Sequence, residues 1–146
     1  MKSGVTVLTL AVLAGCVVSN APMPEPADFP DYDESQFETT ASGLKYRIID
    51  AGAEGTNPSA DDTVYAHYEG TFEDGQVFDS SFRRGQPIDF PLNGVIAGWT
   101  EGLQLIGKGG AVQLIIPGDL AYGPAGRPGI PPNATLRFNV QLIDVL

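Results

Sequence analysis

The sequence is poor in the side chains from which common catalytic and metal sites are built. It contains one cysteine and one histidine among 146 residues. A single cysteine excludes an internal disulfide and a metal site made of several cysteines, and a single histidine excludes a histidine-rich site. No P-loop and no dinucleotide-binding motif occurs. We therefore expect a protein that works without a metal ion and without another cofactor.

The single histidine also argues against nucleophilic catalysis. A Cys/His pair would need Cys16, which lies outside the expected folded domain. A Ser-His-Asp triad is disfavoured rather than excluded, because His67 lies in a strand pattern and no G-x-S-x-G motif occurs. The simpler interpretation of His67 is a strand residue that makes local hydrogen bonds.

Basic residues are scarce as well. Lys and Arg number 8 against 18 Asp and Glu, which gives a formal net charge of -10. Such a charge repels polyanions, so nucleic acid is not an expected partner, and the simplest role of the charge is solubility. The length suits one domain, and 18 glycines and 12 prolines indicate many turns.

The apolar run near the N-terminus, residues 5–13, is well short of the roughly 20 residues that cross a bilayer as a helix. With Lys2 before the run and small residues after it, residues 1–15 have the layout of a cleaved secretory signal peptide. Residues 13–16, LAGC, resemble the bacterial lipobox, which implies that Cys16 becomes a lipid-modified N-terminus. The alternatives are an ordinary signal peptide that contains a cysteine, or an apolar segment buried in the fold.

A lipid on Cys16 would place the protein in the bacterial cell envelope. No Asp follows Cys16 as an inner-membrane retention signal, which favours the periplasmic side of the outer membrane in a cell that has one. Residues 16–40 would then form a lipidated N-terminus and a linker, since residues 19–40 contain four prolines, six acidic residues and no basic residue. This composition predicts an extended tether that holds the folded domain away from the lipid surface.

Residues 41–146 have the patterns of a folded α+β domain. Apolar and polar residues alternate over residues 44–48 and 136–142, and residues 64–71 and 111–116 also have strand character, with a turn at residues 73–75. Helical spacing of apolar residues occurs over residues 95–106. Gly98 and Gly102 weaken this helix, so it must be stabilised by packing against the sheet. We predict a mostly antiparallel sheet over one short helix.

Aromatic and branched apolar residues are common beside the expected turns of this domain. Most aromatics at strand and helix spacing belong to a core, but several here have polar or Gly/Pro-rich neighbours, which is typical of a pocket rim. Spacing alone leaves the core and an apolar ligand cleft equally open. The residues are Tyr68, Phe78, Ile88, Phe90, Val95, Ile96, Trp99, Tyr122 and Phe138.

Short motifs in this domain resemble, in order and spacing, the FKBP-type peptidyl-prolyl cis/trans isomerase family. They are YEG at 68–70, DG at 74–75, FDSS at 78–81, VIAGW at 95–99, EG at 101–102, AYG at 121–123 and IPPNATL at 130–136. Residues 42–46 and 120–123 are similar to the bacterial macrophage infectivity potentiator branch. The resemblance covers essentially all of residues 41–146 and implies an FKBP-like fold, a strongly curved antiparallel sheet of about five strands around one short α-helix.

The resemblance also implies roles for individual residues. Trp99 would be the floor of a pocket beneath a proline ring, and the Tyr122 hydroxyl and the Ile96 backbone N–H would donate hydrogen bonds to substrate carbonyls. Asp79 would be a pocket carboxylate with an orienting or electrostatic role, or else form a purely structural ion pair with Arg84. The implied catalytic residues are Asp79, Tyr122 and Tyr68, and the implied substrate-binding residues are Phe78, Ile88, Phe90, Val95, Ile96, Trp99, Ile130 and Phe138.

Two positions depart from the family pattern. Ile88 stands where many relatives have a rim aromatic residue, and Arg127 replaces a common rim histidine. Both changes bear on affinity and on sequence preference around the proline. The expected pocket floor is unaffected by them.

The resemblance implies an enzyme that speeds rotation about X-Pro bonds in exported proteins and so assists folding in the cell envelope. The alternative is a non-catalytic chaperone or binding module that uses the same cleft. Expected partners are proline-containing polypeptides and immunosuppressant macrolides. Relatives in the infectivity potentiator branch often have a helical dimerisation region before the domain, which is not found here, so a monomer is expected.

Overall fold

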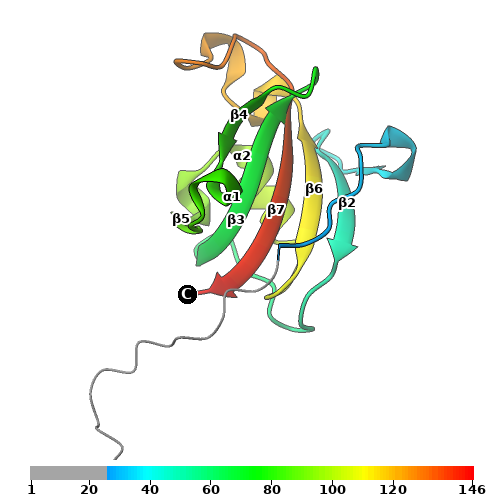
Figure 1. Cartoon of the computed structure of the whole chain (residues 1–146), viewed down its shortest axis with the longest axis vertical. Helices are drawn as coiled ribbons and strands as arrows, with labels where there is room; N and C mark the ends of the chain where they lie inside the picture. Colours follow the sequence, from blue (N-terminus) through cyan, green and yellow to red (C-terminus); the bar gives the residue numbers. More distant parts are fainter. Residues whose placement is uncertain (1–25) are drawn as a thin grey trace, which may run out of the picture.

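The computed structural model describes residues 26–146, so the expected signal peptide and Cys16 lie outside the described part of the chain. The fold is α+β, and a seven-stranded antiparallel sheet crosses in front of helix α2 (Figure 1). The order of the strands is β1-β2-β6-β7-β3-β4, and β5 pairs with β3. The strands are β1 (Glu38–Thr39), β2 (Lys45–Asp50), β3 (Thr63–Phe72), β4 (Val77–Ser80), β5 (Ile88–Pro91), β6 (Ala111–Ile116) and β7 (Leu136–Val145). The helices are α1 (Ser81–Arg84) and α2 (Ala97–Leu103), and short 3-10 turns are η1 (Glu34–Gln36), η2 (Leu92–Gly94), η3 (Gly118–Leu120) and η4 (Gly123–Ala125).

The predicted α+β architecture is confirmed, with more strands than expected. The two additional strands are short: β5 has four residues and β1 has two. Neither is long enough for its apolar and polar residues to show a clear alternation. Both are defined by pairing with longer strands, β1 with β2 and β5 with β3.

The helix is shorter than the predicted range of residues 95–106. It begins after Ile96, whose backbone is extended, and ends at Leu103, with Gln104 as its C-cap. Trp99, Leu103 and Ile106 are nevertheless all buried in the core, as the spacing indicated. The periodicity thus identified these three buried side chains, whereas Ile96 in the same pattern is only partly buried. It overestimated the helix by two residues at its start and three at its end.

Helix α2 packs so closely on β6 that two of its positions have no room for a side chain. A Cβ atom at Gly98 would lie 2.5 Å from Cγ2 of Ile116, and one at Gly102 would lie 2.7 Å from Cδ2 of Leu114. Both glycines lower helix propensity, and both are explained by this contact with the sheet. The same contact brings Trp99, between them, against the inner face of the sheet.

We expect Gly98→Ala to destabilise the domain by about 1 to 3 kcal/mol, because overpacking of the core outweighs the gain in helix propensity of up to about 1 kcal/mol. Urea unfolding measures the change. The control is the same substitution in an Ile116→Ala background, where the clashing side chain is absent and the loss should shrink. An equal loss in both backgrounds would show that the contact with Ile116 is not the cause.

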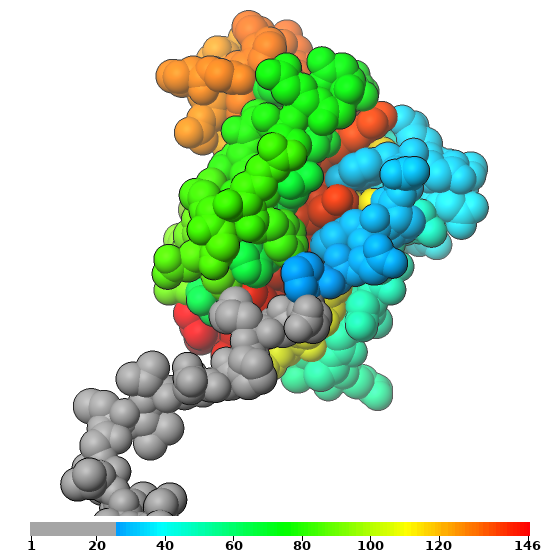
Figure 2. All heavy atoms as spheres, in the orientation of Figure 1, coloured from blue at the N-terminus to red at the C-terminus, as the bar shows by residue number. Residues whose placement is uncertain are grey.

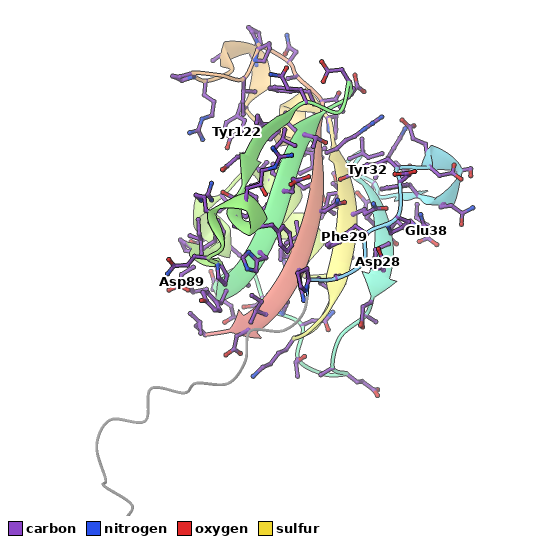
Figure 3. All side chains as sticks on the ribbon, in the orientation of Figure 1. Asp28, Phe29, Tyr32, Glu38, Asp89 and Tyr122 are labelled. Atoms are coloured by element: carbon purple, nitrogen blue, oxygen red, sulfur yellow. The ribbon has the colours of Figure 1, made fainter. Side chains whose placement is uncertain are left out.

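Residues 26–37, here called the N-terminal strap, pack on the outer face of the sheet. Figure 2 shows them in blue across this face, and Figure 3 labels Phe29 and Tyr32 in front of it. The backbone N–H of Ala27 donates to Oε1 of Gln141 at 3.1 Å, and Nε2 of Gln113 donates to the Pro30 carbonyl at 2.6 Å. The prediction of a linker up to about residue 40 is therefore wrong for residues 26–40, which belong to the folded domain.

Aromatic contacts complete the packing of the strap. The Tyr32 ring stacks on Phe37 with centroids 6.0 Å apart, and the Arg137 guanidinium lies 5.2 Å from the Tyr32 ring centroid. Phe29 meets Phe82 of α1 edge to face at 6.4 Å. Composition suggested a tether because prolines and acidic residues outnumber these few aromatic anchors.

No helix within residues 26–146 is long and apolar enough to cross a membrane.

Candidate active site

An apolar cavity of about 500 Å³ lies between the inner face of the sheet, the start of α2 and the loop that precedes β7. Its size is typical of a site for a small molecule or a short peptide segment. It gathers residues from β3, β4, β5, α2 and β7, which are far apart in the sequence. The lining residues are Tyr68, Phe78, Asp79, Phe90, Gly94, Val95, Ile96, Trp99, Tyr122, Arg127 and Phe138.

Trp99 lies at the bottom of this cavity and is 4% exposed. It is the third residue of α2, so the close packing of the helix on β6 fixes its depth. Three aromatic rings surround it edge to face, those of Phe90 at 5.1 Å, Tyr68 at 5.3 Å and Phe138 at 5.5 Å between centroids. Such pairs add about 0.5 to 1.5 kcal/mol each beyond their area burial. The result is a rigid apolar floor.

Gly70 makes room for one wall of the cavity. A Cβ atom at this position would lie 2.5 Å from Cζ of Phe78 and 2.8 Å from Cε1 of Phe138. These two rings meet edge to face with centroids 5.6 Å apart. The glycine of the YEG motif is therefore explained by aromatic packing at the cavity wall.

Tyr68 and Asp79, which line the cavity, form a polar cluster with Arg84, which lines a neighbouring hollow. The Tyr68 hydroxyl donates to Oδ2 of Asp79 at 2.5 Å, and Nη1 of Arg84 donates to Oδ1 of the same carboxylate. Nη2 of Arg84 also donates to the Tyr68 hydroxyl oxygen at 3.0 Å. The three side chains therefore form a closed triangle, and the sequence-based pairing of Asp79 with Arg84 is confirmed.

The triangle keeps Asp79 ionised. Partial burial by itself raises the pKa of Asp79, but the hydrogen bonds from Tyr68 and Arg84 outweigh burial, and the net pKa is lowered. Burial and the bond to Asp79 together raise the pKa of Tyr68, so its phenol stays protonated. A fixed carboxylate thus faces the cavity with its charge balanced by Arg84.

Helix α1 holds Arg84 in place. The Ser80 hydroxyl caps the helix by accepting from the Arg83 N–H, and the Ser81 hydroxyl accepts from the Tyr68 N–H at 2.7 Å. Nδ1 of His67 lies 2.8 Å from the Ser81 hydroxyl, and its ring stacks on Phe82 at 4.6 Å. His67 is therefore a strand residue with local hydrogen bonds, as predicted, and burial lowers its pKa.

Tyr122 lies at the rim of the cavity, beside the loop coloured orange at the top of Figure 3. Its hydroxyl oxygen accepts a hydrogen bond from Nη1 of Arg127 at 3.0 Å, and the Arg127 guanidinium lies 5.0 Å from its ring centroid. Because the oxygen accepts from Arg127, the hydroxyl hydrogen can be donated to another group.

Most of the predicted site residues line this one cavity, and two lie beside it. Ile88 lines a separate hollow with Arg84, because it lies two residues from Phe90 along β5, about 6.6 Å farther along the strand. Ile130 lines a smaller recess of about 160 Å³ that adjoins the cavity along Phe78, Asp79, Tyr122 and Arg127. Six of the eight residues expected to bind substrate thus line the cavity itself, and Ile88 and Ile130 line hollows beside it.

Two lining residues were not predicted. Gly94 contributes backbone just before Val95, and the Asn-Gly pair at 93–94 was an available turn signal. Arg127 was noted only as a departure at the rim. Its place between the AYG and IPPNATL motifs is the signal that could have included it.

Comparison with known proteins gives one consistent family. A family model for FKBP-type peptidyl-prolyl cis-trans isomerase matches residues 54–143. The FKBP-type peptidyl-prolyl cis-trans isomerase FkpA of Escherichia coli (strain K12) is 54% identical over 112 residues, which are 77% of this chain and 41% of that protein. The FKBP-type 22 kDa peptidyl-prolyl cis-trans isomerase of the same strain is 50% identical over 109 residues, 74% of this chain and 52% of that protein.

Two solved structures are similar over the same region. The crystal structure of FkpA from Escherichia coli has a TM-score of 0.74 and 54% identity, over 77% of this chain and 52% of that one. A peptidyl-prolyl cis-trans isomerase from Pseudomonas syringae pv. tomato has a TM-score of 0.69 and 37% identity, over 75% of this chain and 80% of that one. The chain spans only about half, or less, of the length of the two Escherichia coli relatives. On the family match and these identities, the chain belongs to the FKBP-type peptidyl-prolyl cis-trans isomerase family.

Proposed function

We propose that this chain accelerates rotation about X-Pro peptide bonds. The observation that carries the proposal is the cavity of about 500 Å³ with Trp99 as its floor and aromatic walls, a size and surface that suit a proline ring. Rotation must twist a partly double C–N bond over a barrier of about 18 to 20 kcal/mol. The twisted amide has lost its resonance and is less polar, so an apolar and water-poor cavity favours it over the planar ground state. No bond is broken, so no general base is needed.

Fixed hydrogen-bond donors supplement the apolar walls. In the proposed complex, Tyr122 donates its hydroxyl hydrogen to a substrate carbonyl, and the Ile96 backbone N–H serves a second carbonyl. Among residues 26–146 the structure shows no acceptor for the Ile96 N–H, which supports this role. Donors held in place before the reaction stabilise charge that shifts during rotation without further reorganisation.

A protease-coupled assay with a short X-Pro peptide tests this function. Acceleration by the purified chain, blocked by an immunosuppressant macrolide that competes for the cavity, is the expected result. No acceleration, together with suppressed aggregation of an unfolded client, would replace the enzyme with a non-catalytic chaperone or binding module that uses the same cleft.

We further propose that the protein acts on exported polypeptides in the bacterial cell envelope. The support comes from residues 1–15, whose composition fits a lipoprotein signal peptide cleaved just before Cys16. Several acyl chains at about 0.8 kcal/mol per buried methylene would hold the domain stably on a membrane, the outer membrane in a cell that has one. The motifs at 42–46 and 120–123 support a place in the infectivity potentiator-like branch of the family.

A monomer is proposed as the functional form. Within residues 26–146 the large apolar side chains that are exposed are Ile48 in β2 and Leu146 just after β7, and β6 lies between these two strands in the sheet. Two separate residues do not make the continuous apolar patch that a stable interface needs. Analytical ultracentrifugation of the soluble chain measures its mass, and a dimer would contradict the proposal.

We expect Cys16→Ser to abolish labelling by a radioactive or clickable fatty acid and to release the domain from membranes into the soluble fraction. The thiol of Cys16 carries the first lipid group in the proposed anchor, and the hydroxyl of serine cannot replace it. The control is a conservative change outside the lipobox, Val18→Ala, which should leave labelling unchanged. Membrane attachment that persists in Cys16→Ser would contradict lipid anchoring at this residue.

A further inference from the structure

Arg127 lies where the apolar cavity meets a smaller recess. The cavity of about 500 Å³ and the recess of about 160 Å³ share four lining residues, Phe78, Asp79, Tyr122 and Arg127. The recess continues along Pro128, Gly129 and Ile130. Trp99 and Arg127 line the same cavity, so a peptide with its proline ring on Trp99 would have a neighbouring residue within reach of Arg127, since an extended chain advances about 3.3 to 3.6 Å per residue.

The charge of Arg127 is not balanced by a carboxylate of the described residues. Within residues 26–146, Arg83 pairs with Glu69 and Arg84 with Asp79, whereas Arg127 forms no ion pair. Its side chain makes one hydrogen bond, to the Tyr122 hydroxyl, and its guanidinium lies over the ring of the same residue. A guanidinium has several further N–H groups suited to the oxygens of a carboxylate.

The carboxylate that lies nearest in the cavity does not use these groups. Asp79 instead accepts from Tyr68 through Oδ2 and from Arg84 through Oδ1, so its charge is already paired with Arg84. Arg127 and Tyr122 thus present one cation, held by its stacking on an aromatic ring, at the edge of an apolar cavity. That arrangement suits an anionic group brought in by the substrate.

We propose that Arg127 makes the enzyme select prolines that have an acidic residue directly before or after them in the substrate chain. The proposal rests on the proposed function, since it places a substrate proline against Trp99. At long range the net charge of -10 repels an acidic peptide. At physiological ionic strength charges are screened beyond about 8 Å, so the contact with Arg127 decides the preference.

The test compares peptides that differ only in one charge, Glu against Gln, placed before the proline in one pair and after it in another. Isomerisation is followed by exchange NMR spectroscopy, which needs no cleaving protease. For the wild-type chain we expect kcat/KM to be about two- to fivefold higher for Glu than for Gln in at least one pair, the range of an exposed ion pair. Raising the ionic strength to about 1 M should remove the preference.

Two substitutions assign the preference to Arg127. In Arg127→Gln the ratio of Glu to Gln should fall to about one or below, and Arg127→Glu should favour a Lys peptide over the Gln peptide. Each ratio compares kcat/KM for two peptides on the same variant. A general loss of activity caused by disturbing Tyr122 would lower both values equally and leave the ratio unchanged. The control is Arg47→Gln, which removes the same charge from β2 on a surface outside the cavity and should keep the wild-type ratio.

The proposal is overturned if wild type and Arg127→Gln give the same ratio in both peptide pairs. A different failure, no acceleration of any peptide, would refute the proposed function instead. The preference is then judged from the dissociation constants of the same peptides, measured by the fluorescence of Trp99, the one tryptophan of the chain. Equal constants for Glu and Gln peptides would overturn the proposal there too.

Discussion

Replacing Trp99 with alanine is expected to lower kcat/KM for an X-Pro peptide by about 30- to 100-fold. The indole forms the cavity floor, and its loss removes about 2 to 3 kcal/mol of apolar contact with the proline ring, at about 1.4 kcal/mol for each factor of ten in rate. The same change leaves a hole among Tyr68, Phe90 and Phe138, whose ring centroids lie 5.1 to 5.5 Å from that of Trp99. We therefore also expect the free energy of unfolding to fall by about 3 to 5 kcal/mol.

Two control variants separate the effect on the floor from the loss of stability. Trp99→Phe keeps an aromatic ring and should retain most of the activity. Leu142→Ala removes a fully buried side chain of β7 that does not line the cavity, so it should destabilise the fold by about 2 to 5 kcal/mol while the folded fraction keeps its activity. Urea unfolding followed by circular dichroism measures stability. If Trp99→Ala were as active per folded molecule as Leu142→Ala, Trp99 would be a core residue without a role at the site.

The cavity shows which information came from the sequence and which did not. Local patterns identified apolar residues beside turns but could not distinguish a core from a cleft, because both need apolar side chains at strand and helix spacing. The resemblance to the family brought Tyr68, Asp79, Trp99 and Tyr122 into one site, and the structure places all four on one cavity. The other substrate-binding residues that the resemblance implied include Ile88 and Ile130, which line hollows beside this cavity.

The N-terminal strap could not be predicted from composition because its anchors are few. Phe29, Tyr32 and Phe37 lie among more numerous prolines and acidic residues. The mean composition of the segment is therefore that of a polar linker, and it conceals the three aromatic side chains that pack on the domain. The better signal lies in β6, whose residues 111–116 are buried on both faces. In a strand that packs one face on a helix, residues of the other face are polar if that face is exposed to solvent. A strand without such alternation of apolar and polar residues is therefore expected to have another segment of the chain covering its second face. Here the strap does so, and Gln113 is fully buried beneath it.

Removing the carboxylate of Asp79 is expected to reduce turnover with little effect on stability. Asp79→Ala removes the acceptor of the Tyr68 hydroxyl and the ion-pair partner of Arg84. A hydrogen bond to a charged group contributes about 1.5 to 3 kcal/mol. If the bond orients the site for turnover, its loss lowers kcat/KM by about 10- to 100-fold. The pair is partly exposed, with 47% of the Arg84 side chain and 41% of the Asp79 side chain accessible, so its effect on folding should stay below about 1 kcal/mol. Asp79→Asn keeps an oxygen that can accept the hydrogen bond from Tyr68 but removes the negative charge. Comparing it with Asp79→Ala therefore separates the effect of that hydrogen bond from the effect of the charge.

Asp144→Asn is the matched control, because Asp144 forms a similarly exposed ion pair with Lys108 at 3.0 Å and does not line the cavity. Its activity should equal that of wild type. If Asp79→Ala behaved like Asp144→Asn, with unchanged turnover, then Asp79 would be a structural ion-pair partner. A loss in Asp79→Ala that Asp79→Asn does not share would assign the effect to the orientation of Tyr68 rather than to charge.

The pH dependence of turnover gives an independent measure of the role of this carboxylate. Burial raises the pKa of Asp79, but the hydrogen bonds from Tyr68 and Arg84 lower it further than burial raises it. The folded pKa is thus below the unfolded value of about 3.9, so the carboxylate stabilises the fold above that pH, and this contribution is lost as the pH falls through the folded value. If the carboxylate takes part in turnover, kcat/KM should fall at low pH as Asp79 becomes protonated, which gives the pH profile an acidic limb. Asp79→Asn has no carboxylate at this position, so its pH profile should lack this limb. If the variant retained the limb, the titration would belong to another group, and the charge of Asp79 would have no part in turnover.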